Sequence, residues 1–278
     1  MEEIIFLNNK FLTPKEAKVS VLAPGFLYGW GLFETMRAYK KRIVYLPEHL
    51  ERLKKSAKLL DLACPYPLLK LKEIIQRIVE ICGFSDARIR INLWRPQTRV
   101  ADILITARKY LPYPSGKYKS GFRLCLSNFR QSQDSFLTQL KTMNYLLYGL
   151  AYTEAREKGF DEAIILNQRG YITEASRSNI FLVRAKELFT PALKCGCMDG
   201  ITRKVIFDLA KKYNIKIYEG KFSLQDLYKA DEAFLTNSLI GVMPVAPIEK
   251  KRIAKGSKLF RMTEFFLQKY NLLLRHGT

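Results

Sequence analysis

Strict alternation of apolar and polar residues marks residues 87–95, where Ile89, Ile91 and Leu93 share one face. Such period-two alternation is typical of a strand with one buried side. Residues 102–107 form the next strand and are the predicted antiparallel partner. The first half of the chain is therefore expected to contain an antiparallel sheet.

Two amphipathic helices are predicted before these strands. The apolar face of the first, residues 47–60, comprises Leu50, Leu53, Ala57 and Leu60. Pro47 suits its first turn. The second helix spans residues 67–82 and is closed by Gly83. Shorter strands are predicted at residues 4–11, as a hairpin with an Asn8-Asn9 turn, and at residues 42–46.

The second half is organised around residues 141–184, which begin with a lysine just before an amphipathic helix. The apolar positions of this helix are Leu146, Leu147, Leu150 and Ala151, and Gly159 stands where the helix would stop. Short apolar runs predict strands at 163–166 and 180–183, with turn residues at 167–170. Residues 173–176 lie between these two strands.

Further elements surround this stretch. They are a strand at 121–127, a polar loop at 131–135, a helix from 201 to about 213, a helix N-cap at Ser223 with Asp226 in its first turn, a buried strand in the block 232–245, and a C-terminal amphipathic helix capped by Ser257. Residues 109–117 contain Pro, Gly and Ser without an apolar period. We therefore expect an α/β (α+β) protein with a small N-terminal domain at 1–110, a linker at 111–117 and a larger C-terminal domain at 118–278.

Composition narrows the class of protein. The chain has 278 residues, 48% hydrophobic and 26% charged, as expected for a globular protein. Its net charge of +21 raises the hypothesis of nucleic-acid binding. The basic residues are interleaved with Glu along the predicted helices, however, and no nucleic-acid-binding signature is present. We therefore interpret the charge as a solvated cationic surface that also attracts anionic ligands.

Location and metal content follow from small signals. No apolar run reaches the roughly 20 residues of a membrane helix, and the acidic start Met1-Glu2-Glu3 is unlike a signal peptide. The five cysteines are odd in number, which favours free thiols in a reducing compartment. Cys195 and Cys197 lack partners for a zinc site in a chain with two histidines. A cytoplasmic protein without membrane, nucleic acid or metal is expected.

A lysine at an element boundary and a carboxylate about thirty residues later suit pyridoxal 5′-phosphate (PLP) chemistry. In such chemistry a lysine such as Lys141 forms a Schiff base, and a carboxylate such as Glu174 keeps the pyridine nitrogen protonated. Taken alone, this pair of residues is a weak signal, because most lysines and glutamates solvate a surface.

Two longer motifs make the interpretation specific. The stretches K-T-M-N-Y from Lys141 and G-Y-I-T-E-A-S-R-S-N-I-F from Gly170 resemble the signature of fold-type IV PLP enzymes. That family includes the branched-chain and D-amino-acid aminotransferases and 4-amino-4-deoxychorismate lyase. The resemblance implies a homodimer with PLP in the cleft between two domains, Lys141 as the Schiff-base lysine and Glu174 as the partner of the pyridine nitrogen.

The same resemblance suggests the remaining cofactor contacts. His49-Leu50-Glu51-Arg52-Leu53 resembles the family segment whose arginine grips the PLP phosphate, a role that suits the planar fork of Arg52. His49 is expected to orient its neighbours. The other residues implied at the cofactor are Ser176, Ile201, Thr202 and Ser238. Ile201 and Thr202 follow Gly200 at a predicted helix start, where free N–H groups bind phosphate.

Substrate contacts are less determined. Residues 25–37 resemble the family's Y-G-D-G-x-F-E-T block beside the cofactor and the dimer interface, but Trp30 replaces the acidic residue found in many members. As a bare pattern, these glycines could equally form a simple bend between strands. The candidate substrate residues are Tyr28, Glu34, Arg95, Asn237 and Leu239.

Two reaction types of the family, lyase and aminotransferase, remain as alternatives. The block N-x-L-x-x-V-M-P-V from Asn237 resembles the lyase, whereas the aminotransferases tend toward T-G-T or S-S-T followed by V-T-P-V. The R-x-H and Y-x-R motifs of the aminotransferases were not found. The resemblance therefore favours a 4-amino-4-deoxychorismate lyase that acts on a small anionic amine. A branched-chain or D-amino-acid aminotransferase is the alternative, and a basic nucleic-acid-binding protein the remote one.

Overall fold

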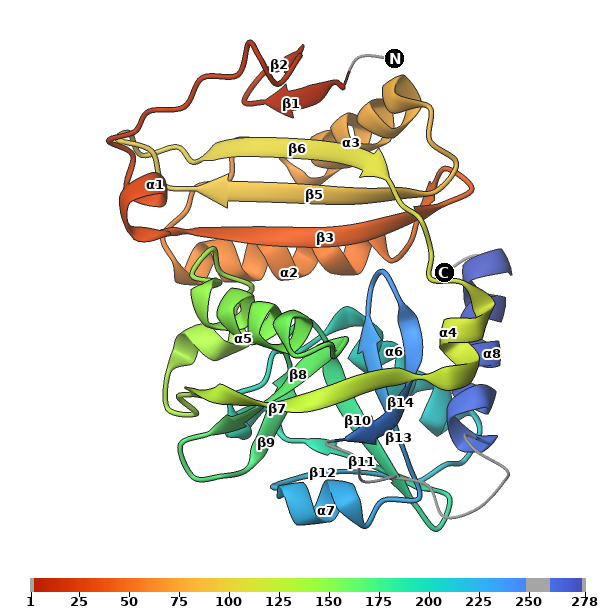
Figure 1. Ribbon diagram of the computed structural model, residues 1–278. Helices are drawn as coiled ribbons and strands as arrows, with labels where there is room; N and C mark the ends of the chain where they lie inside the picture. The colour runs from red at the N-terminus through yellow and green to blue at the C-terminus, as the bar shows by residue number, and fades with distance from the viewer. Residues whose placement is uncertain (1–2, 249–260, 277–278) are drawn as a thin grey trace. The chain divides into compact units, whose positions relative to one another are not determined.

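The computed structural model describes residues 3–248 and 261–276, which form two compact units (Figure 1). The first unit contains the described residues up to Pro112 together with Leu140–Asn144. The second contains Tyr113–Gln139 and the described residues from Tyr145 onward. The segment with Lys141, which the sequence analysis assigned to the second domain, thus packs with the first unit.

The first unit is built on a six-stranded sheet with the order β2-β1-β6-β5-β3-β4. Its strands are β1 (Ile5–Leu7), β2 (Lys10–Leu12), β3 (Gly31–Tyr39), β4 (Arg42–Ile43), β5 (Ala87–Trp94) and β6 (Asp102–Lys109). All pairings in this sheet are antiparallel. The predicted hairpin at residues 4–11 and the predicted pairing of the two alternating strands are confirmed. The predicted strand at 42–46 was too long, because helix α2 already begins at Leu46.

Helices α2 (Leu46–Leu59) and α3 (Leu68–Cys82) supply the apolar core of this unit together with the sheet, and α1 (Pro24–Tyr28) is short. From the strands, Leu32, Met36, Ile89, Ile91 and Leu93 join this core. Side chains alternate along a strand, so Phe33 and Arg90 point to the opposite face of the sheet. The alternation that predicted β5 therefore also separates a helix-covered face from a face that is available for chemistry.

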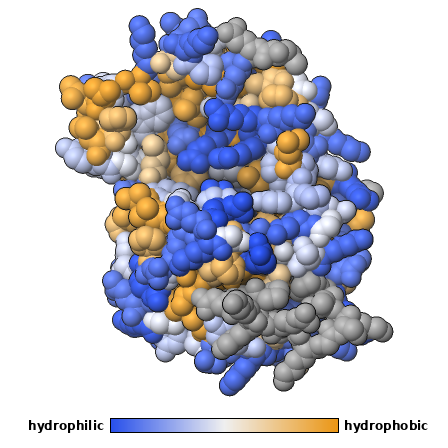
Figure 2. Space-filling model, in the orientation of Figure 1, coloured by the Kyte–Doolittle hydropathy of each residue, from blue (hydrophilic) through white to orange (hydrophobic). Residues whose placement is uncertain are grey.

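Large apolar side chains are exposed at residues 19–30 of the first unit. They are Val19, Val21, Leu22, Phe26, Leu27, Tyr28 and Trp30. Figure 2 shows this apolar surface over α1 and the segment that precedes it. Contiguous exposed apolar surface on a protein often marks an interface.

The second unit is built on an eight-stranded mixed sheet with the order β12-β11-β10-β13-β14-β7-β8-β9. Its strands are β7 (Phe122–Gln131), β8 (Glu162–Asn167), β9 (Ile172–Ala175), β10 (Asn179–Arg184), β11 (Glu187–Pro191), β12 (Ile217–Gly220), β13 (Glu232–Asn237) and β14 (Gly241–Ile248). Glu174 lies on β9, which pairs with β8. Strand β9 was not predicted from the sequence, where residues 173–176 were expected to lie between strands. Its small and polar residues carry little apolar signal.

The helices of this unit are α4 (Ser115–Ser120), α5 (Leu146–Glu157), α6 (Ile201–Lys212), α7 (Leu224–Tyr228) and α8 (Arg261–His276). Helix α4 begins inside the segment predicted as a linker. In α5 the predicted apolar face is wrong in part, because Leu146 is 74% and Leu150 is 41% exposed. Ala151 and Ala155 are the buried residues of α5. The predicted cap at Ser223 is confirmed, with a reciprocal bond to Asp226.

Other expectations concern single features. Ser257, predicted to cap the last helix, lies outside the described residues. The five cysteines are free thiols. Within residues 3–248 and 261–276, no helix has the length and apolar character needed to cross a membrane. The same residues contain no group of three potential metal ligands among His, Cys, Asp and Glu.

Candidate active site

Lys141 is held by the edge of β3 in the first unit. The carbonyl oxygen of Lys141 accepts a bond from the N–H of Phe33 at 2.8 Å, and the N–H of Met143 donates to Gly31 O at 2.8 Å. Thr142 pairs with Leu32, whose side chain lies in the helix-covered core. The alternation therefore puts Lys141 on the opposite face, beside Phe33.

Two cations converge on Phe33 at this face. The Nζ of Lys141 lies 4.5 Å from the centroid of the Phe33 ring, and the guanidinium carbon of Arg90 lies 4.0 Å from it. The Nε of Arg90 also donates to Asn92 Oδ1 at 3.0 Å. The quadrupole of the ring favours each of the two positive groups. Arg90 on β5 and Lys141 therefore share one aromatic partner on this face of the sheet.

On the helix-covered face, a buried carboxylate holds Arg52. Glu34, which is 1% exposed, accepts from Arg52 Nε at 2.7 Å and from Arg52 Nη2 at 2.8 Å. His49 Nδ1 lies 2.7 Å from the Oε2 atom of Glu34. Such a bidentate pair fixes the plane of the guanidinium. Glu34 is therefore placed to orient Arg52, whereas the sequence analysis suggested that it contacts substrate.

The protonation states in this cluster follow from burial and charge. Burial raises the pKa of Glu34, but the charge of Arg52 and the hydrogen bonds from Arg52 and His49 outweigh it, so the net pKa of Glu34 lies well below its usual value. Burial lowers the pKa of His49, and the charges of Arg52 and Lys141 lower it further. The charge of Glu34 and its hydrogen bond raise this pKa but do not outweigh the other effects. The folded protein therefore keeps Glu34 ionised and His49 neutral near pH 7.

We expect the stability of the protein to fall on acidification in two steps. His49 has a lowered pKa in the folded state, so below about pH 6.5 the unfolded chain binds a proton that the folded chain does not. The slope for one such proton approaches about 1.4 kcal/mol per pH unit. Glu34, whose folded-state pKa is also lowered, contributes stability that is lost below about pH 4.3. Urea unfolding at pH 8, 7, 6 and 5 measures the first step.

The matched variant is His49→Asn, whose amide nitrogen can replace Nδ1 toward Glu34. This variant should lack the loss of stability below about pH 6.5, and its stability at pH 8 should change less than its stability at pH 5. An unchanged pH profile in this variant would show that His49 is not the group responsible.

In the second unit, neutral donors hold the carboxylate of Glu174. Oε1 accepts from the hydroxyl of Tyr148 at 2.8 Å and from the N–H of Met198 at 3.3 Å. Oε2 accepts from Asn179 Nδ2 at 3.2 Å. Tyr148 in turn accepts from Gln131 Nε2 at 2.7 Å. Because these donors carry no charge, they fix the position of Glu174 without neutralising it, and its negative charge suits a protonated ring nitrogen.

The start of helix α6 lies against the same cluster. Asn179 Oδ1 lies so close to Gly200 that a Cβ atom there would clash with it, and Asn179 Nδ2 also donates to Met198 O at 2.9 Å. Ile201 and Thr202 are the first two residues of α6, and the N–H groups of a first helical turn have no partner within the helix. Such a helix start binds phosphate.

Thr236 supplies a further oxygen on this face of the sheet. It pairs directly with Asn179 across β10 and β13, so the two side chains point the same way. Its hydroxyl oxygen is buried and has no hydrogen-bond partner among the residues that the structure describes. A buried unpaired hydroxyl is costly, and a ligand oxygen would satisfy it. This part of the second unit therefore suits an anionic group.

Two predicted ligand residues have internal partners instead. Ser176 is fully buried, accepts from the N–H of Ala163 at 3.3 Å and donates to Glu162 at 3.4 Å. Asn237 Oδ1 accepts from the N–H groups of Leu239 at 2.9 Å and Ile240 at 3.0 Å. These geometries make Ser176 and Asn237 supports of the backbone. Ser238 lies in the turn that Asn237 closes.

Trp30 and Arg95 form a separate contact in the first unit. The indole N–H of Trp30 donates to Leu60 O at 3.0 Å, and the guanidinium carbon of Arg95 lies 5.4 Å from the Trp30 ring. Arg95 also donates to Asp61 O at 2.7 Å. Arg95 therefore connects the end of β5 to the segment after α2, whereas Arg90 shares the Phe33 ring with Lys141. Tyr28 is exposed at the end of α1.

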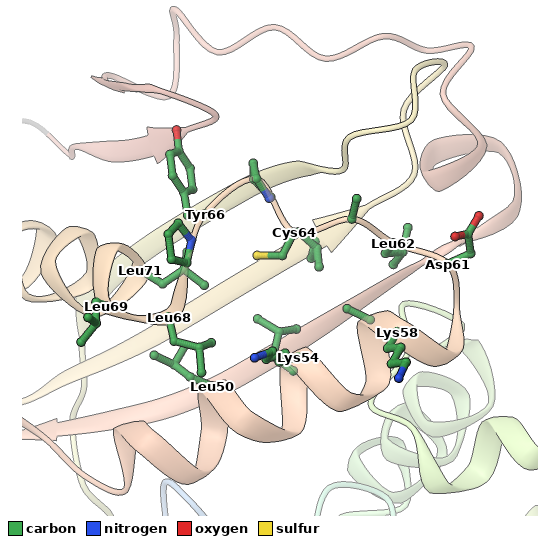
Figure 3. Close-up of a pocket in the computed structure, with 16 residues that line it drawn as sticks. Leu50, Lys54, Lys58, Asp61, Leu62, Cys64, Tyr66, Leu68, Leu69 and Leu71 are labelled. Carbon is green, nitrogen blue, oxygen red and sulfur yellow. The ribbon is translucent and has the colours of Figure 1, made fainter.

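A cavity of about 760 Å³ opens elsewhere in the first unit, between α2 and the start of α3 (Figure 3). Its walls are mostly apolar and include Leu50, Leu62 and Leu68, while Lys54 and Lys58 project from α2. No predicted site residue lines it. The cavity is therefore distinct from the groups around Lys141.

Comparison with known proteins shows the family to which the chain belongs. Residues 31–248 match the family model described as amino-transferase class IV. The chain belongs to this family. A Methanocaldococcus jannaschii protein, provisionally named a branched-chain-amino-acid aminotransferase, is 34% identical over 276 residues, 96% of this chain and 94% of that protein. Aminodeoxychorismate lyase of Bacillus subtilis is 30% identical over 263 residues, 89% of this chain and 87% of that protein.

A solved structure adds the cofactor. A branched-chain amino acid aminotransferase from the organism abbreviated T.th., solved with pyridoxamine 5′-phosphate, matches with a TM-score of 0.88 and 30% identity, over 96% of this chain and 94% of that chain. The predicted fold-type IV architecture and the prediction of PLP as cofactor are confirmed for this class IV aminotransferase family member. The unpaired hydroxyl of Thr236, the start of α6 and the neutral donors around Glu174 suit a phosphate and a pyridinium nitrogen.

Six residues around Lys141, Glu174 and Ser176 were not singled out from the sequence, although Phe33, Asn179 and Thr236 lie in blocks discussed there: Phe33, Arg90, Glu162, Tyr148, Asn179 and Thr236. Arg90 had a usable signal, because it alternates with the buried positions of β5 and must point to the other face. Asn179 lies in the motif that begins at Gly170, five residues after Glu174, whereas Tyr148 reaches Glu174 from α5, which no local pattern indicates.

Proposed function

We propose that this class IV aminotransferase family member is a 4-amino-4-deoxychorismate lyase, which forms 4-aminobenzoate and pyruvate. The observation that supports this choice is the turn after β13. Asn237 uses its carbonyl oxygen to bind the N–H groups of Leu239 and Ile240. In the T-G-T block toward which the family's aminotransferases tend, a glycine at this position has no side chain and leaves such donors available for a ligand.

The residues of the chain would share the work as follows. Lys141 binds the cofactor covalently, and its amine later takes the proton from the substrate carbon that bears nitrogen. Arg52, Ile201, Thr202 and Ser238 would hold the phosphate. Arg90, which lies with Lys141 at Phe33, would bind a carboxylate of the substrate.

The bound cofactor supplies an electron-poor ring, kept protonated at its nitrogen by Glu174, that accepts electrons from the substrate. After loss of the proton, the bond between the ring carbon and the oxygen of the enolpyruvyl group would break, and the enolpyruvate that leaves would take up a proton to become pyruvate. The carbocycle becomes aromatic, so the elimination is downhill. The protein then has to align the leaving group and keep Lys141 from returning the proton.

Product analysis tests the proposal. Holoenzyme incubated with aminodeoxychorismate should release pyruvate, detected with lactate dehydrogenase, and an equal amount of 4-aminobenzoate, detected by fluorescence. Absence of both products, together with conversion of the bound cofactor to its amine form by an amino acid, would rule out the lyase.

An aminotransferase of branched-chain or D-amino acids is the second candidate. It is favoured by the 34% identity to the Methanocaldococcus jannaschii relative and by the placement of Arg90, which suits the α-carboxylate of an amino acid. In this reaction Lys141 would return the proton to a different carbon. A panel of L- and D-amino acids as amine donors separates this candidate from the lyase.

Either reaction predicts a defect when Arg90 is replaced by glutamine. A charge-assisted hydrogen bond to a carboxylate contributes about 1.5–3 kcal/mol, so KM should rise by about 10- to 100-fold. The control is Arg95→Gln, which removes the contacts to Trp30 and Asp61 and should mainly lower stability. Steady-state kinetics on both variants make the measurement. A larger rise in KM for Arg95→Gln than for Arg90→Gln would reverse the assignment.

We also propose that the chain acts as a cytoplasmic homodimer. The exposed apolar side chains of residues 19–30 support an interface between copies, because water contact at Leu22, Phe26 and Leu27 is unfavourable. Light scattering should give twice the mass of the 32.3 kDa chain, and a monomeric mass at micromolar concentration would contradict the proposal.

A further inference from the structure

A second buried carboxylate lies in the second unit, on β8, the strand that pairs with the strand carrying Glu174. Glu162 is the first residue of β8 and is 3% exposed. Its Oε1 accepts from the hydroxyl of Ser178 at 2.8 Å, and its Oε2 accepts from the N–H of Arg177 at 2.9 Å and from the hydroxyl of Ser176 at 3.4 Å. These hydrogen bonds all go to the turn between β9 and β10.

This turn sets the geometry of Glu174. The N–H of Ala175 donates to Ser178 O at 2.7 Å, which closes the turn directly after Glu174. Asn179, the next residue, donates to Glu174 Oε2 and to Met198 O. A change in the turn would therefore alter the position of Glu174 and of its partner Asn179 together.

The same hydrogen bonds continue to the turn after β13. Asn237 Nδ2 donates to Ser178 Oγ at 3.0 Å and to Arg177 O at 3.3 Å. Its Oδ1 accepts from the N–H groups of Leu239 and Ile240. Two turns that carry predicted cofactor and substrate residues are thereby joined through Ser178.

The donors and acceptors in these hydrogen bonds allow one placement of the hydroxyl protons. Because Asn237 Oδ1 accepts two backbone N–H groups, its Nδ2 must donate, and Ser178 Oγ must accept. The proton of Ser178 then points to Glu162. Ser176 accepts from Ala163 N–H, so its proton also points to Glu162. With the Arg177 N–H, three donors converge on this side chain. Burial raises the pKa of Glu162, and these three donors oppose that rise, because an ionised carboxylate can accept all of them.

We propose that Glu162 is a positioning residue, which fixes the β9–β10 turn and the turn at residues 237–240 through Ser178 and so aligns Glu174 with the cofactor. The proposal rests on the PLP-dependent family and is independent of the choice between lyase and aminotransferase. An amide at position 162 has a donor where the network needs an acceptor. It would face either the Arg177 N–H or the Ser178 hydroxyl with the wrong polarity.

The test compares holoenzymes of Glu162→Gln, Ser178→Ala and the double variant. In Glu162→Gln we expect cofactor release to accelerate about 10-fold, as for loss of one hydrogen bond to a charged group. Hydrogen–deuterium exchange should rise at both residues 174–179 and 237–240. The double variant should release cofactor no faster than Glu162→Gln alone, because both side chains act in one series of bonds.

The control is Glu154→Gln, which alters another carboxylate of the same unit. Glu154 binds Ser127, Asn128 and Lys158, away from both turns. Its variant should leave cofactor release and both exchange segments unchanged. The proposal is overturned if Glu154→Gln and Glu162→Gln have equal effects, if the effects of Glu162→Gln and Ser178→Ala add, or if exchange rises at one turn only.

Should Glu162→Gln fail to fold, Ser178→Ala tests the proposal by itself. It keeps the carboxylate and removes the bond from Asn237 Nδ2 to Ser178 Oγ, leaving only the longer bond to Arg177 O. It should then accelerate cofactor release and increase exchange at residues 237–240. Unchanged values in this variant would reject the coupling. None of these measurements uses the substrate. A failed lyase assay would therefore not affect the outcome for Glu162.

Discussion

Replacing Lys141 with alanine is expected to abolish covalent retention of PLP and to lower turnover by about 10³-fold or more. The amine has two functions in this family, as the covalent attachment of the cofactor and as the group that moves the proton. The backbone bond from Phe33 N–H to Lys141 O does not depend on the side chain. The segment at β3 should therefore keep its structure in the variant.

Borohydride reduction followed by peptide mapping measures the attachment directly. The wild-type protein should carry the label at Lys141, and Lys141→Ala should carry none. Lys109→Ala, a change at an exposed lysine at the end of β6 in the same unit, is the matched control and should retain label and activity. A labelled peptide elsewhere, or full turnover by Lys141→Ala without added amines, would contradict the assignment.

The sequence predicted those elements whose burial is periodic. Alternation predicted β5 and its partner β6, and Gly83 ends α3 in the left-handed conformation as expected. Where burial is not periodic, the predictions were weaker. β9 was missed because Thr173 and Glu174 are buried by pairing with β8, a long-range contact that no local pattern reveals.

The candidate site shows the same division. Lys141 and Glu174 are predicted from motifs that are continuous in the sequence. Of the residues that contact them, Asn179 lies five residues after Glu174 in the same motif, whereas Tyr148 reaches Glu174 from α5 and Phe33 reaches Lys141 from β3. Arg90 and Glu162 resemble ordinary surface charges in the sequence. Tertiary structure adds that Glu162 is buried and Arg90 is half-buried, and that their partners on β3 and in the β9–β10 turn come from other segments.

The second large effect is expected at Glu174. In Glu174→Gln the carbonyl oxygen can keep the two donors Tyr148 and Met198, but the amide nitrogen then faces Asn179 Nδ2. Asn179 cannot reverse its amide without losing the bond from Nδ2 to Met198 O. The variant loses the negative charge for the pyridinium nitrogen and gains a contact between two donors. Turnover should fall by about 10²- to 10³-fold, the cost of removing one preorganised electrostatic contact.

Two companion variants separate charge from geometry. Tyr148→Phe keeps the carboxylate and removes one hydrogen bond, so turnover should fall by about 10-fold. Glu174→Asp keeps the charge on a shorter side chain, and its turnover should lie between those of Glu174→Gln and Tyr148→Phe. Turnover at saturating PLP, with cofactor affinity measured separately, distinguishes a weaker site from a slower reaction. If Glu174→Gln turns over within about 3-fold of the wild type at saturating cofactor, the carboxylate does not sustain the charge of the ring, and another group must stabilise the electrons released from the substrate.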